Sequence, residues 1–161
     1  MEFAVRKMRI SDIQQVQNVA KTSWNATYNG IIPIEVQERF LESAYNDEMM
    51  SRRLERSHIY VAELNKEIIG FANFSFVRND GKVELSAIYL YPEYQGKGIG
   101  SALLKEGINE SQYVKEVFIN VEKENIIGRK FYEAKKFQIV KEFDDDFDGH
   151  ILKTVRMVLK L

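Results

Sequence analysis

The sequence predicts an α+β fold in a single domain of residues 1–161, with a central mixed, mostly antiparallel sheet of about six to seven strands flanked by four helices. Short turn signals join three consecutive strand patterns, which is typical of an antiparallel meander. A later strand–helix–strand unit, residues 83–121, predicts one parallel pair, because a helix carries the chain back between parallel strands. A chain of this length buries about two-thirds of its unfolded surface, which is enough for one core.

The N-terminal third predicts one strand and two helical regions. Residues 3–8 form an apolar strand pattern. Ser11 followed by Gln14 is a capping-box signal, and apolar residues recur at helical spacing after it. These core-facing residues are Ile13, Val16, Ala20 and Trp24. A second helical region covers residues 35–54, with a break expected near residues 45–47.

The remaining segments alternate strands with two helices. Turn signals at Asn65-Lys66 and Asp80-Gly81 separate the strands of the meander. The predicted strands are His58–Glu63, Ile68–Phe76, Val83–Leu90, Glu116–Val121, Phe137–Phe143 and His150–Leu159, and the predicted helices are Ile99–Asn109 and Ile126–Ala134.

A glycine-rich run follows the strand that ends at Leu90. It consists of Gln95, Gly96, Lys97, Gly98, Ile99, Gly100 and Ser101. Three glycines at alternate positions leave one side of the backbone bare, so a tight turn is possible and a ligand can approach closely. A helix begins within the run, and the free N–H groups at a helix N-terminus favour a phosphate. The run therefore predicts a site for a pyrophosphate-bearing cofactor.

Two common phosphate loops do not fit this run. The dinucleotide pattern G-x-G-x-x-G needs its third glycine at Ser101, and the P-loop needs its lysine after the last glycine. The pattern Q/R-x-x-G-x-G/A does fit, at Gln95, Gly98 and Gly100. With a strand and Pro92 before it, the run resembles the acetyl-CoA loop of the GNAT superfamily of N-acetyltransferases. The resemblance implies acetyl-CoA (CoA) as the cofactor and a GNAT-like sheet splayed between its fourth and fifth strands.

Residues 125–137 are similar to a second GNAT motif, N-x-x-A-x-x-F-Y-x-x-x-G-F. Asn125, Gly128 and Tyr132 share one side of the predicted helix. Another side, which we expect to face the core, carries Ile127, Phe131 and Ala134. The resemblance implies that this helix packs along the pantetheine arm and that Tyr132 donates a proton to the leaving thiolate. Gly128 replaces the usual Ala, and Lys136 replaces the usual Gly, so we expect the following turn to be made differently.

Acetyl transfer to an amine needs a deprotonated amine, a polarised carbonyl and a protonated leaving thiolate. An alkyl amine with a pKa near ~10.4 is protonated at neutral pH, so a general base is required. Glu84 heads its strand, where many GNAT proteins carry the base, and we predict this role for it. The resemblance implies that backbone N–H groups of Ile88, Tyr89 and Leu90 polarise the carbonyl. Because Cys is absent, we expect direct attack by the amine.

The expected acceptor is a primary amine, either a small amine such as a polyamine or a peptide or protein amine. In GNAT proteins the linker between the first two helices and the last hairpin loop flank the acceptor site; here these are residues 24–33 and 144–149. We predict substrate contacts from Tyr28, Trp24 and Asp146, although Trp24 also continues the core stripe of its helix. The carboxylates of the hairpin would attract a cationic amine, and the alternative is a solvated hairpin tip.

The composition excludes several other classes. The 23 basic and 24 acidic residues nearly balance, so no overall field favours nucleic acid or an anionic membrane. With no Cys and two His, a disulfide framework, a thiolate metal site and a His cluster are excluded. The N-terminal residues lack an apolar stretch and no segment approaches transmembrane length, so we expect neither a signal peptide nor a transmembrane helix. We expect a soluble cytoplasmic protein, and the resemblance allows a homodimer.

Two alternatives stay open beside an N-acetyltransferase. A CoA-binding sensor or regulatory module would keep the glycine loop without catalysis, and the presence of Glu84 and Tyr132 argues against it. A nucleotide-binding protein would use the loop for ADP or NAD. The glycine register and the position of Glu116, which precedes the apolar part of its strand, argue against that second alternative.

Overall fold

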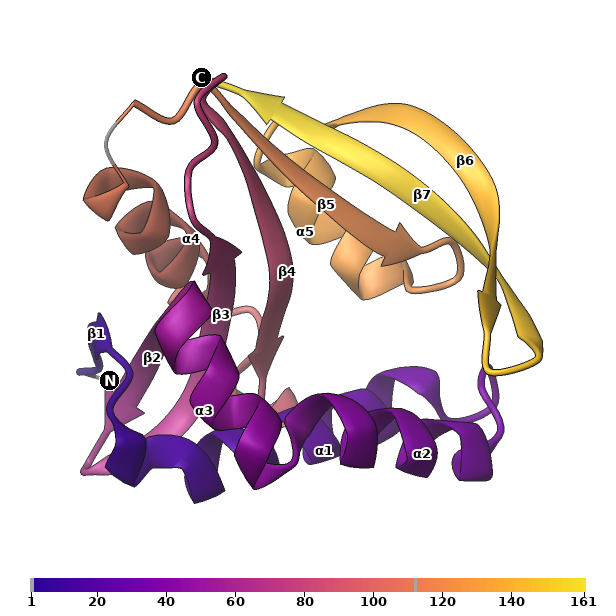
Figure 1. Ribbon diagram of the computed structural model, residues 1–161, viewed down its shortest axis with the longest axis horizontal. Helices are drawn as coiled ribbons and strands as arrows, with labels where there is room; N and C mark the ends of the chain where they lie inside the picture. The colour runs from indigo at the N-terminus through magenta and orange to yellow at the C-terminus, as the bar shows by residue number, and fades with distance from the viewer. Residues whose placement is uncertain (1, 112) are drawn as a thin grey trace.

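The computed structural model describes residues 2–111 and 113–161 and shows one sheet with helices on both faces (Figure 1). Its seven strands lie in the order β1-β2-β3-β4-β5-β7-β6. The β4–β5 pair is parallel, and the other five neighbouring pairs are antiparallel. The elements are β1 (Ala4–Lys7), η1 (Ile10–Asp12), α1 (Ile13–Tyr28), α2 (Ile34–Tyr45), α3 (Asp47–Arg56), β2 (Ser57–Leu64), β3 (Glu67–Ser75), β4 (Lys82–Leu90), η2 (Pro92–Tyr94), α4 (Ile99–Glu110), β5 (Glu116–Glu122), α5 (Ile126–Ala134), β6 (Gln138–Phe147) and β7 (His150–Lys160).

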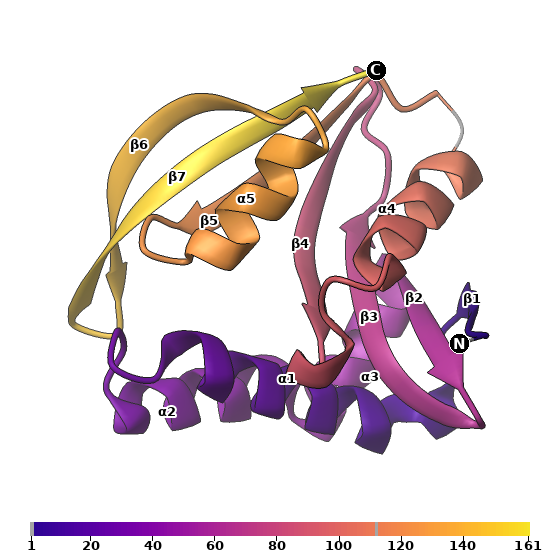
Figure 2. The same cartoon turned by 180° about the vertical axis from the view of Figure 1, so that it is seen from behind.

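The sheet separates two apolar cores. Helices α1, α2 and α3 pack on one face, which is turned toward the viewer in Figure 1. Helices α4 and α5 cover the other face, which Figure 2 shows from behind. Side chains of β4 contribute to both cores because successive residues of a strand point to opposite faces. Leu85 belongs to the α4–α5 core and Ala87 to the α1–α3 core.

The predicted fold class is confirmed, with one more helix than expected. The region 35–54 forms two helices, because Asn46 breaks it and its side chain accepts a hydrogen bond from Met49 N at 2.8 Å, which caps α3. The predicted Ser11 cap is wrong. A 3-10 turn precedes α1, and the capping contact there is Asp12, whose carboxylate accepts from Arg9 N at 2.8 Å and also pairs with Arg6.

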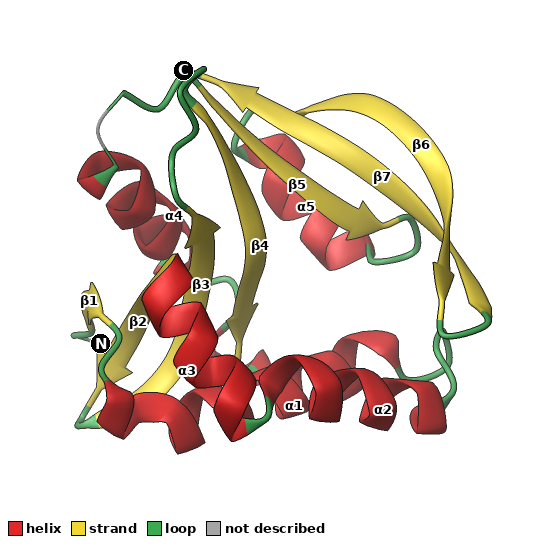
Figure 3. Cartoon of the chain, viewed as in Figure 1, coloured by secondary structure: helices red, strands yellow, loops and turns green. Residues whose placement is uncertain are grey.

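Strands β4 and β5 part soon after they meet, as Figure 3 shows for the yellow arrows on either side of the opening. The two strands pair at three positions: Lys82 with Glu116, Val83 with Val117 and Glu84 with Phe118. A bulge at Ser86 shifts β4 against β3, since Phe74 pairs with Leu85 and Asn73 with Ala87. The splay between the fourth and fifth strands is thus confirmed. Beyond Glu84, β4 has β3 as its neighbour on one side only.

Candidate active site

The glycine run forms a turn that presents backbone N–H groups. Gly96 and Gly98 have φ of 75° and 84°, in the left-handed region that favours glycine, and a Cβ on either would meet nothing within 4 Å. Gly98 is the N-cap of α4, and no described side chain caps this end of the helix. The N–H groups of the first turn are therefore available to a pyrophosphate.

Other residues of the run have structural contacts. A Cβ at Gly100 would lie 3.1 Å from Cε1 of Phe131, so this glycine allows α4 to approach α5. Ile99 is fully buried in the α4–α5 core, whereas Lys97 is exposed and lies over the ring of Tyr94. The cofactor contacts predicted for Gln95 and Ser101, which are half-buried, stay predictions.

The end of β4 offers an unpaired backbone edge. Residues Ile88, Tyr89 and Leu90 pair with β3 on one side, and β5 has diverged on the other. An extended ligand can pair with such an edge as a further strand would. Gly70 of β3 leaves room for the Leu90 side chain, because a Cβ there would lie 2.2 Å from Cδ2 of Leu90.

Helix α5 begins with a side-chain cap that explains one departure from the GNAT motif. Asn125 accepts a hydrogen bond from Gly128 N at 3.0 Å. A Cβ at position 128 would lie 2.7 Å from Nδ2 of the same Asn125 side chain. Glycine at position 128 therefore fits the conformation of this cap, where alanine would displace the amide.

The predicted core face of α5 is wrong for Ile127 and Ala134, whereas Phe131 is half-buried and packs against the α4–α5 core. Ile127 is 67% exposed and Ala134 is exposed, whereas Tyr132 is 6% exposed. The side that carries Tyr132 faces the sheet, so the periodicity was right and the choice of side was not. The ring of Tyr132 packs against Phe131 and Phe137, with centroids 5.3 and 5.4 Å away.

A Schellman motif fixes the end of α5 beneath Tyr132. Phe137 N donates to Tyr132 O at 3.0 Å, and Lys136 N donates to Glu133 O at 3.0 Å. Lys136 has φ of 77°, which is the left-handed conformation that glycine usually provides. The expectation of a different turn is therefore wrong, since lysine adopts the backbone geometry that the motif requires.

Three phenols from distant parts of the chain meet near the splay. Burial raises the pKa of the Tyr132 hydroxyl well above its usual value, and the neighbouring hydroxyls of Tyr89 and Tyr28 raise it further. Burial likewise raises the pKa of Tyr89. The hydrogen bond that Trp24 Nε1 donates to the Tyr89 hydroxyl at 2.9 Å lowers this pKa, but by less than burial raises it. All three hydroxyls keep their protons at neutral pH and can act as hydrogen-bond donors.

Trp24 and Tyr28 line the same end of α1. Trp24 is 5% exposed and stacks on Phe40 of α2 and Phe147 of β6, with centroid distances of 4.3 and 5.7 Å. The Tyr28 ring lies 4.5 Å from Trp24. These packed side chains join α1, α2 and the β6–β7 hairpin, and the substrate contacts predicted for them stay predictions.

Glu84 lies where β4 and β5 still pair, and Arg156 of β7 holds its carboxylate. Both nitrogens Nη1 and Nη2 of Arg156 donate to Glu84, which keeps 40% of its side chain exposed. Arg156 also donates to Oδ1 of Asn120 at 3.0 Å and lies over the Phe118 ring. Sequence reasoning missed Arg156, because nothing in a strand pattern reveals which distant residue lies opposite.

The acidic hairpin differs from the expected loop. Strand β6 continues to Phe147, and Asp148 and Gly149, with φ of 52° and 81°, make a two-residue turn. The Asp-Gly pair was the signal for this turn. Asp146 is exposed and accepts from Gly149 N at 2.8 Å. Phe147 and Leu152 face α1 and α2. Asp146 pairs with Ile151, and both lie on the opposite face of the hairpin.

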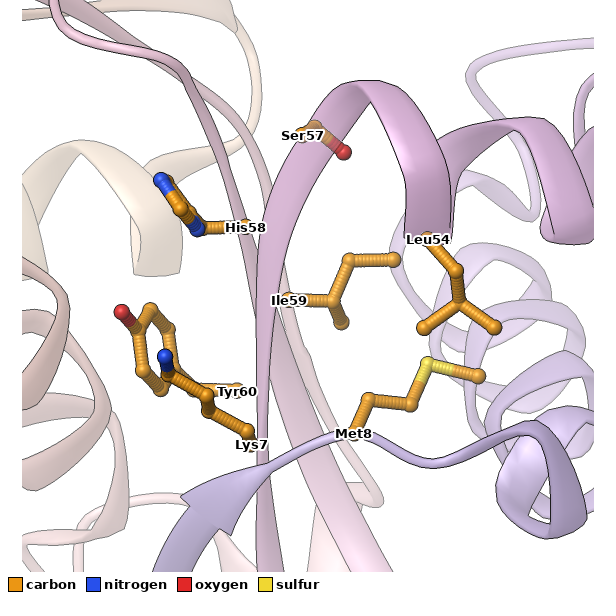
Figure 4. A pocket seen from close by; sticks show the side chains of 7 residues that line it. All are labelled: Lys7, Met8, Leu54, Ser57, His58, Ile59 and Tyr60. Carbon is orange, nitrogen blue, oxygen red and sulfur yellow. The ribbon is translucent and has the colours of Figure 1, made fainter.

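Two pockets lie beside α3. One, of about 220 Å³, lies among β1, α3 and β2 and is shown in Figure 4; it is lined by Lys7, Met8, Leu54, Ser57, His58, Ile59 and Tyr60. The other, of about 360 Å³, lies beside α3 and includes three arginines, Arg52, Arg53 and Arg56. Within residues 2–111 and 113–161, no cluster of His, Cys, Asp and Glu is arranged to hold a metal, and no helix is long and apolar enough to cross a membrane.

Comparison with known proteins agrees with this geometry. The sequence pattern of the Acetyltransferase (GNAT) family matches residues 17–137. The spermidine N(1)-acetyltransferase of Thermoplasma acidophilum is 31% identical over 155 residues, which cover 91% of this chain and 95% of that protein. An uncharacterised N-acetyltransferase of Bacillus subtilis, YuaI, is 36% identical over 107 residues, 64% of this chain and 61% of that protein.

Solved structures share the fold over the full chain. The PaiA N-acetyltransferase from Thermoplasma acidophilum, in complex with coenzyme A, matches with a TM-score of 0.85 and 28% identity, covering 100% of both chains. YncA from Salmonella typhimurium, with its cofactor acetyl-CoA, matches with a TM-score of 0.71 over 100% of this chain and 95% of that one, and at 19% identity shows the fold alone. The chain therefore belongs to the GNAT acetyltransferase family: it is an acyl-CoA-dependent N-acetyltransferase whose cofactor is acetyl-CoA.

Proposed function

We propose that the protein transfers the acetyl group of acetyl-CoA to a primary amine by direct attack, and that a polyamine is the acceptor class. The observation that supports this most is the unpaired edge of β4 beyond Glu84, to which Tyr89 belongs, together with the buried hydroxyls of Tyr132 and Tyr28 that interact with the Tyr89 hydroxyl. The similarity to a spermidine N(1)-acetyltransferase over 91% of the chain supports the acceptor class. The single domain, the cytoplasmic location and the homodimer stay predictions.

Backbone groups hold the cofactor in this proposal. The N–H groups of residues 96–101 bind the pyrophosphate at the start of α4. The free edge of residues 88–90 pairs with the pantetheine arm, and its N–H groups polarise the carbonyl. Asn125 and Gly128 line the same arm from α5. Acetyl-CoA supplies the activated acetyl group as a thioester.

Two side chains move protons. Glu84 accepts the proton of the acceptor ammonium, directly or through water, and leaves a neutral amine whose nitrogen bonds to the acetyl carbon as the C–S bond breaks. Tyr132 donates a hydrogen bond and then its proton to the departing sulfur, and the second proton that the nitrogen loses as the amide forms returns to the Tyr132 oxygen through water. Arg156 is a positioning residue here, because its two contacts fix the orientation of the Glu84 carboxylate. No covalent enzyme intermediate is formed, since the chain lacks Cys.

An amine panel tests the proposal. Spermidine, spermine, an aminoglycoside, free amino acids and a basic peptide are each mixed with the protein and acetyl-CoA, and free thiol and the mass of the product are followed. We expect spermidine to stimulate thiol release and to gain one acetyl group. Tight binding of CoA without amine-dependent thiol release for any member of the panel would contradict the proposal.

A further inference from the structure

We propose that Glu122 binds an ammonium group of the acceptor, at the open end of the splay. This inference rests on the proposed function, because it assigns the acceptor subsite of the same reaction. Glu122 is the last residue of β5 and is 8% exposed, and the acetyl-transfer chemistry described above makes no use of it.

The strand register shows which side of the sheet Glu122 occupies. Val117, Ile119 and Val121 belong to the α4–α5 core. Glu122 alternates with them and pairs with Thr154 of β7, so it shares the opposite face with Asn120 and Arg156. That face is the one on which α1 and α2 pack. Glu84 lies on this face where β4 and β5 still pair. Glu122 lies at the other end of β5, where β5 no longer pairs with β4.

The Glu122 carboxylate is buried beside hydrogen-bond donors but has no cation partner. Its Oε2 accepts from Glu124 N at 2.7 Å. Among the described residues, no Lys, Arg or His nitrogen lies within 4.0 Å of it. Burial raises the pKa of Glu122 and the carboxylate of Glu124 adds to the rise, whereas backbone hydrogen bonds from Glu124 and Asn125 and the charge of Arg129 oppose it. A buried carboxylate without a counter-charge is costly, and a bound ammonium would supply that charge.

Groups from α1 complete the subsite. Burial, the Tyr89 hydroxyl and the nearby Glu122 charge each raise the pKa of Tyr28, and a hydrogen bond with the Asn125 side chain opposes the rise. Tyr28 in turn lies near Tyr132, where the thiolate is expected to leave. One turn earlier, Asn25 has a buried amide oxygen with no donor within the described part of the chain. A carboxylate and a free amide oxygen both accept hydrogen bonds, as an ammonium requires.

The hairpin carboxylates suit this role less well. Asp148 pairs with Arg39, and Asp144 pairs with Lys153 at 3.3 Å. Asp146 caps the turn through Gly149 N, on the face away from α1. Asp144 and Asp148 are therefore paired with cations, and the exposed Asp145 and Asp146 are solvated, whereas the Glu122 carboxylate is buried and has no cation partner among the residues that the structure describes.

The test compares Glu122→Gln with Glu124→Gln. Glutamine keeps an oxygen for Glu124 N, so the turn is retained, and Glu124 is an exposed carboxylate two residues away. With spermidine as the probe, we expect Glu122→Gln to raise the KM for spermidine about ten- to hundredfold, the range for a charged hydrogen bond, with kcat and the KM for acetyl-CoA within about threefold of the wild type. Glu124→Gln is expected to change none of them.

A binding measurement separates this inference from the proposed function. Calorimetry of spermidine with the CoA complex needs no turnover, so it reports on Glu122 even if no amine is acetylated. We expect the Kd for spermidine to rise about ten- to hundredfold in Glu122→Gln and to stay unchanged in Glu124→Gln. If Glu122→Gln fails to fold by circular dichroism, Glu122→Asp, which keeps the charge on a shorter arm, is expected to bind spermidine more weakly than the wild type. Unchanged spermidine binding in the folded variant, or equal losses in both variants, would overturn the inference.

Discussion

The cofactor side and the acceptor side of the splay are built in different ways. The proposed cofactor side uses two contiguous segments, residues 88–101 and 125–137, which offer mainly backbone groups and glycines that leave room for a ligand. The proposed acceptor side uses side chains from α1, α2, β5 and the β6–β7 hairpin. A site made of backbone is encoded in local sequence, whereas a site made of distant side chains appears only when the chain packs.

The largest expected effect comes from removing the proposed base on the acceptor side. Glu84→Gln keeps the side-chain size and one acceptor oxygen for Arg156 but removes proton acceptance, so we expect kcat to fall at least ~100-fold, the usual minimum for a general base, with acetyl-CoA binding unchanged. Steady-state kinetics with both substrates varied measures this. Glu142→Gln, an exposed carboxylate on β6, is the control. A kcat within threefold of the wild type would remove Glu84 from the mechanism.

A pair of glycines with the same backbone angle tests whether the two sides differ as described. Gly98 and Gly30 both have φ of 84° and open space where a Cβ would lie, but Gly98 lies on the cofactor side and Gly30 in the α1–α2 linker. Replacement of either by Ala costs about 1–2 kcal/mol of stability. We expect the Kd for acetyl-CoA, measured by calorimetry, to rise about tenfold in Gly98→Ala alone. An equal rise in both variants would contradict the distinction.

The third expected effect is on stability and depends on pH. The pKa of Glu122 is raised in the folded state, so its contribution to stability is present below the ordinary value of ~4.3 and is lost as pH rises through the folded value. We therefore expect Glu122→Gln to melt at a higher temperature than the wild type at pH 7. The difference in melting temperature between Glu122→Gln and the wild type is expected to vanish below about pH 4. Thermal melts from about pH 3.5 to 8 measure this difference, and a Gln variant that is less stable at pH 7 would contradict it.

The smallest expected effect concerns the turn after α5. Lys136→Gly removes the left-handed strain of a lysine and is expected to stabilise the protein by up to ~1 kcal/mol, a rise in Tm of about 2–4 °C, without loss of activity. The matched variant Lys135→Gly, at φ of −84°, gains no such relief and is expected to lower the Tm. A lower Tm for Lys136→Gly would show that lysine contributes contacts at this turn.

The same division explains what could be predicted from sequence. Element order, the parallel pair and the glycine turn depend on local patterns, and they were predicted correctly. The splay came with the GNAT resemblance, whose motifs lie in contiguous segments. The Asp-Gly turn was also encoded locally, but the strand before it contains three aspartates, whose polarity hid its continuation.

What could not be predicted depends on which side of an element meets another. Periodicity separated the two sides of α5, yet only the packed sheet shows that Tyr132 faces inward and Ile127 outward. The contact of Arg156 with Glu84 joins residues 72 positions apart. The sequence does not distinguish Glu122 from the other acidic residues among its 24. Its position follows only from the register of β5, which pairs it with Thr154.

The most direct test of the central claim, acetyl transfer assisted by a tyrosine at the splay, is the turnover of Tyr132→Phe with acetyl-CoA and spermidine. Phenylalanine keeps the packing against Phe131 and Phe137 but removes the proton donor. The account predicts that kcat falls at least ~100-fold while the KM for acetyl-CoA stays within about threefold, and that Tyr113→Phe, on an exposed tyrosine, changes neither. A Tyr132→Phe enzyme as fast as the wild type would contradict it.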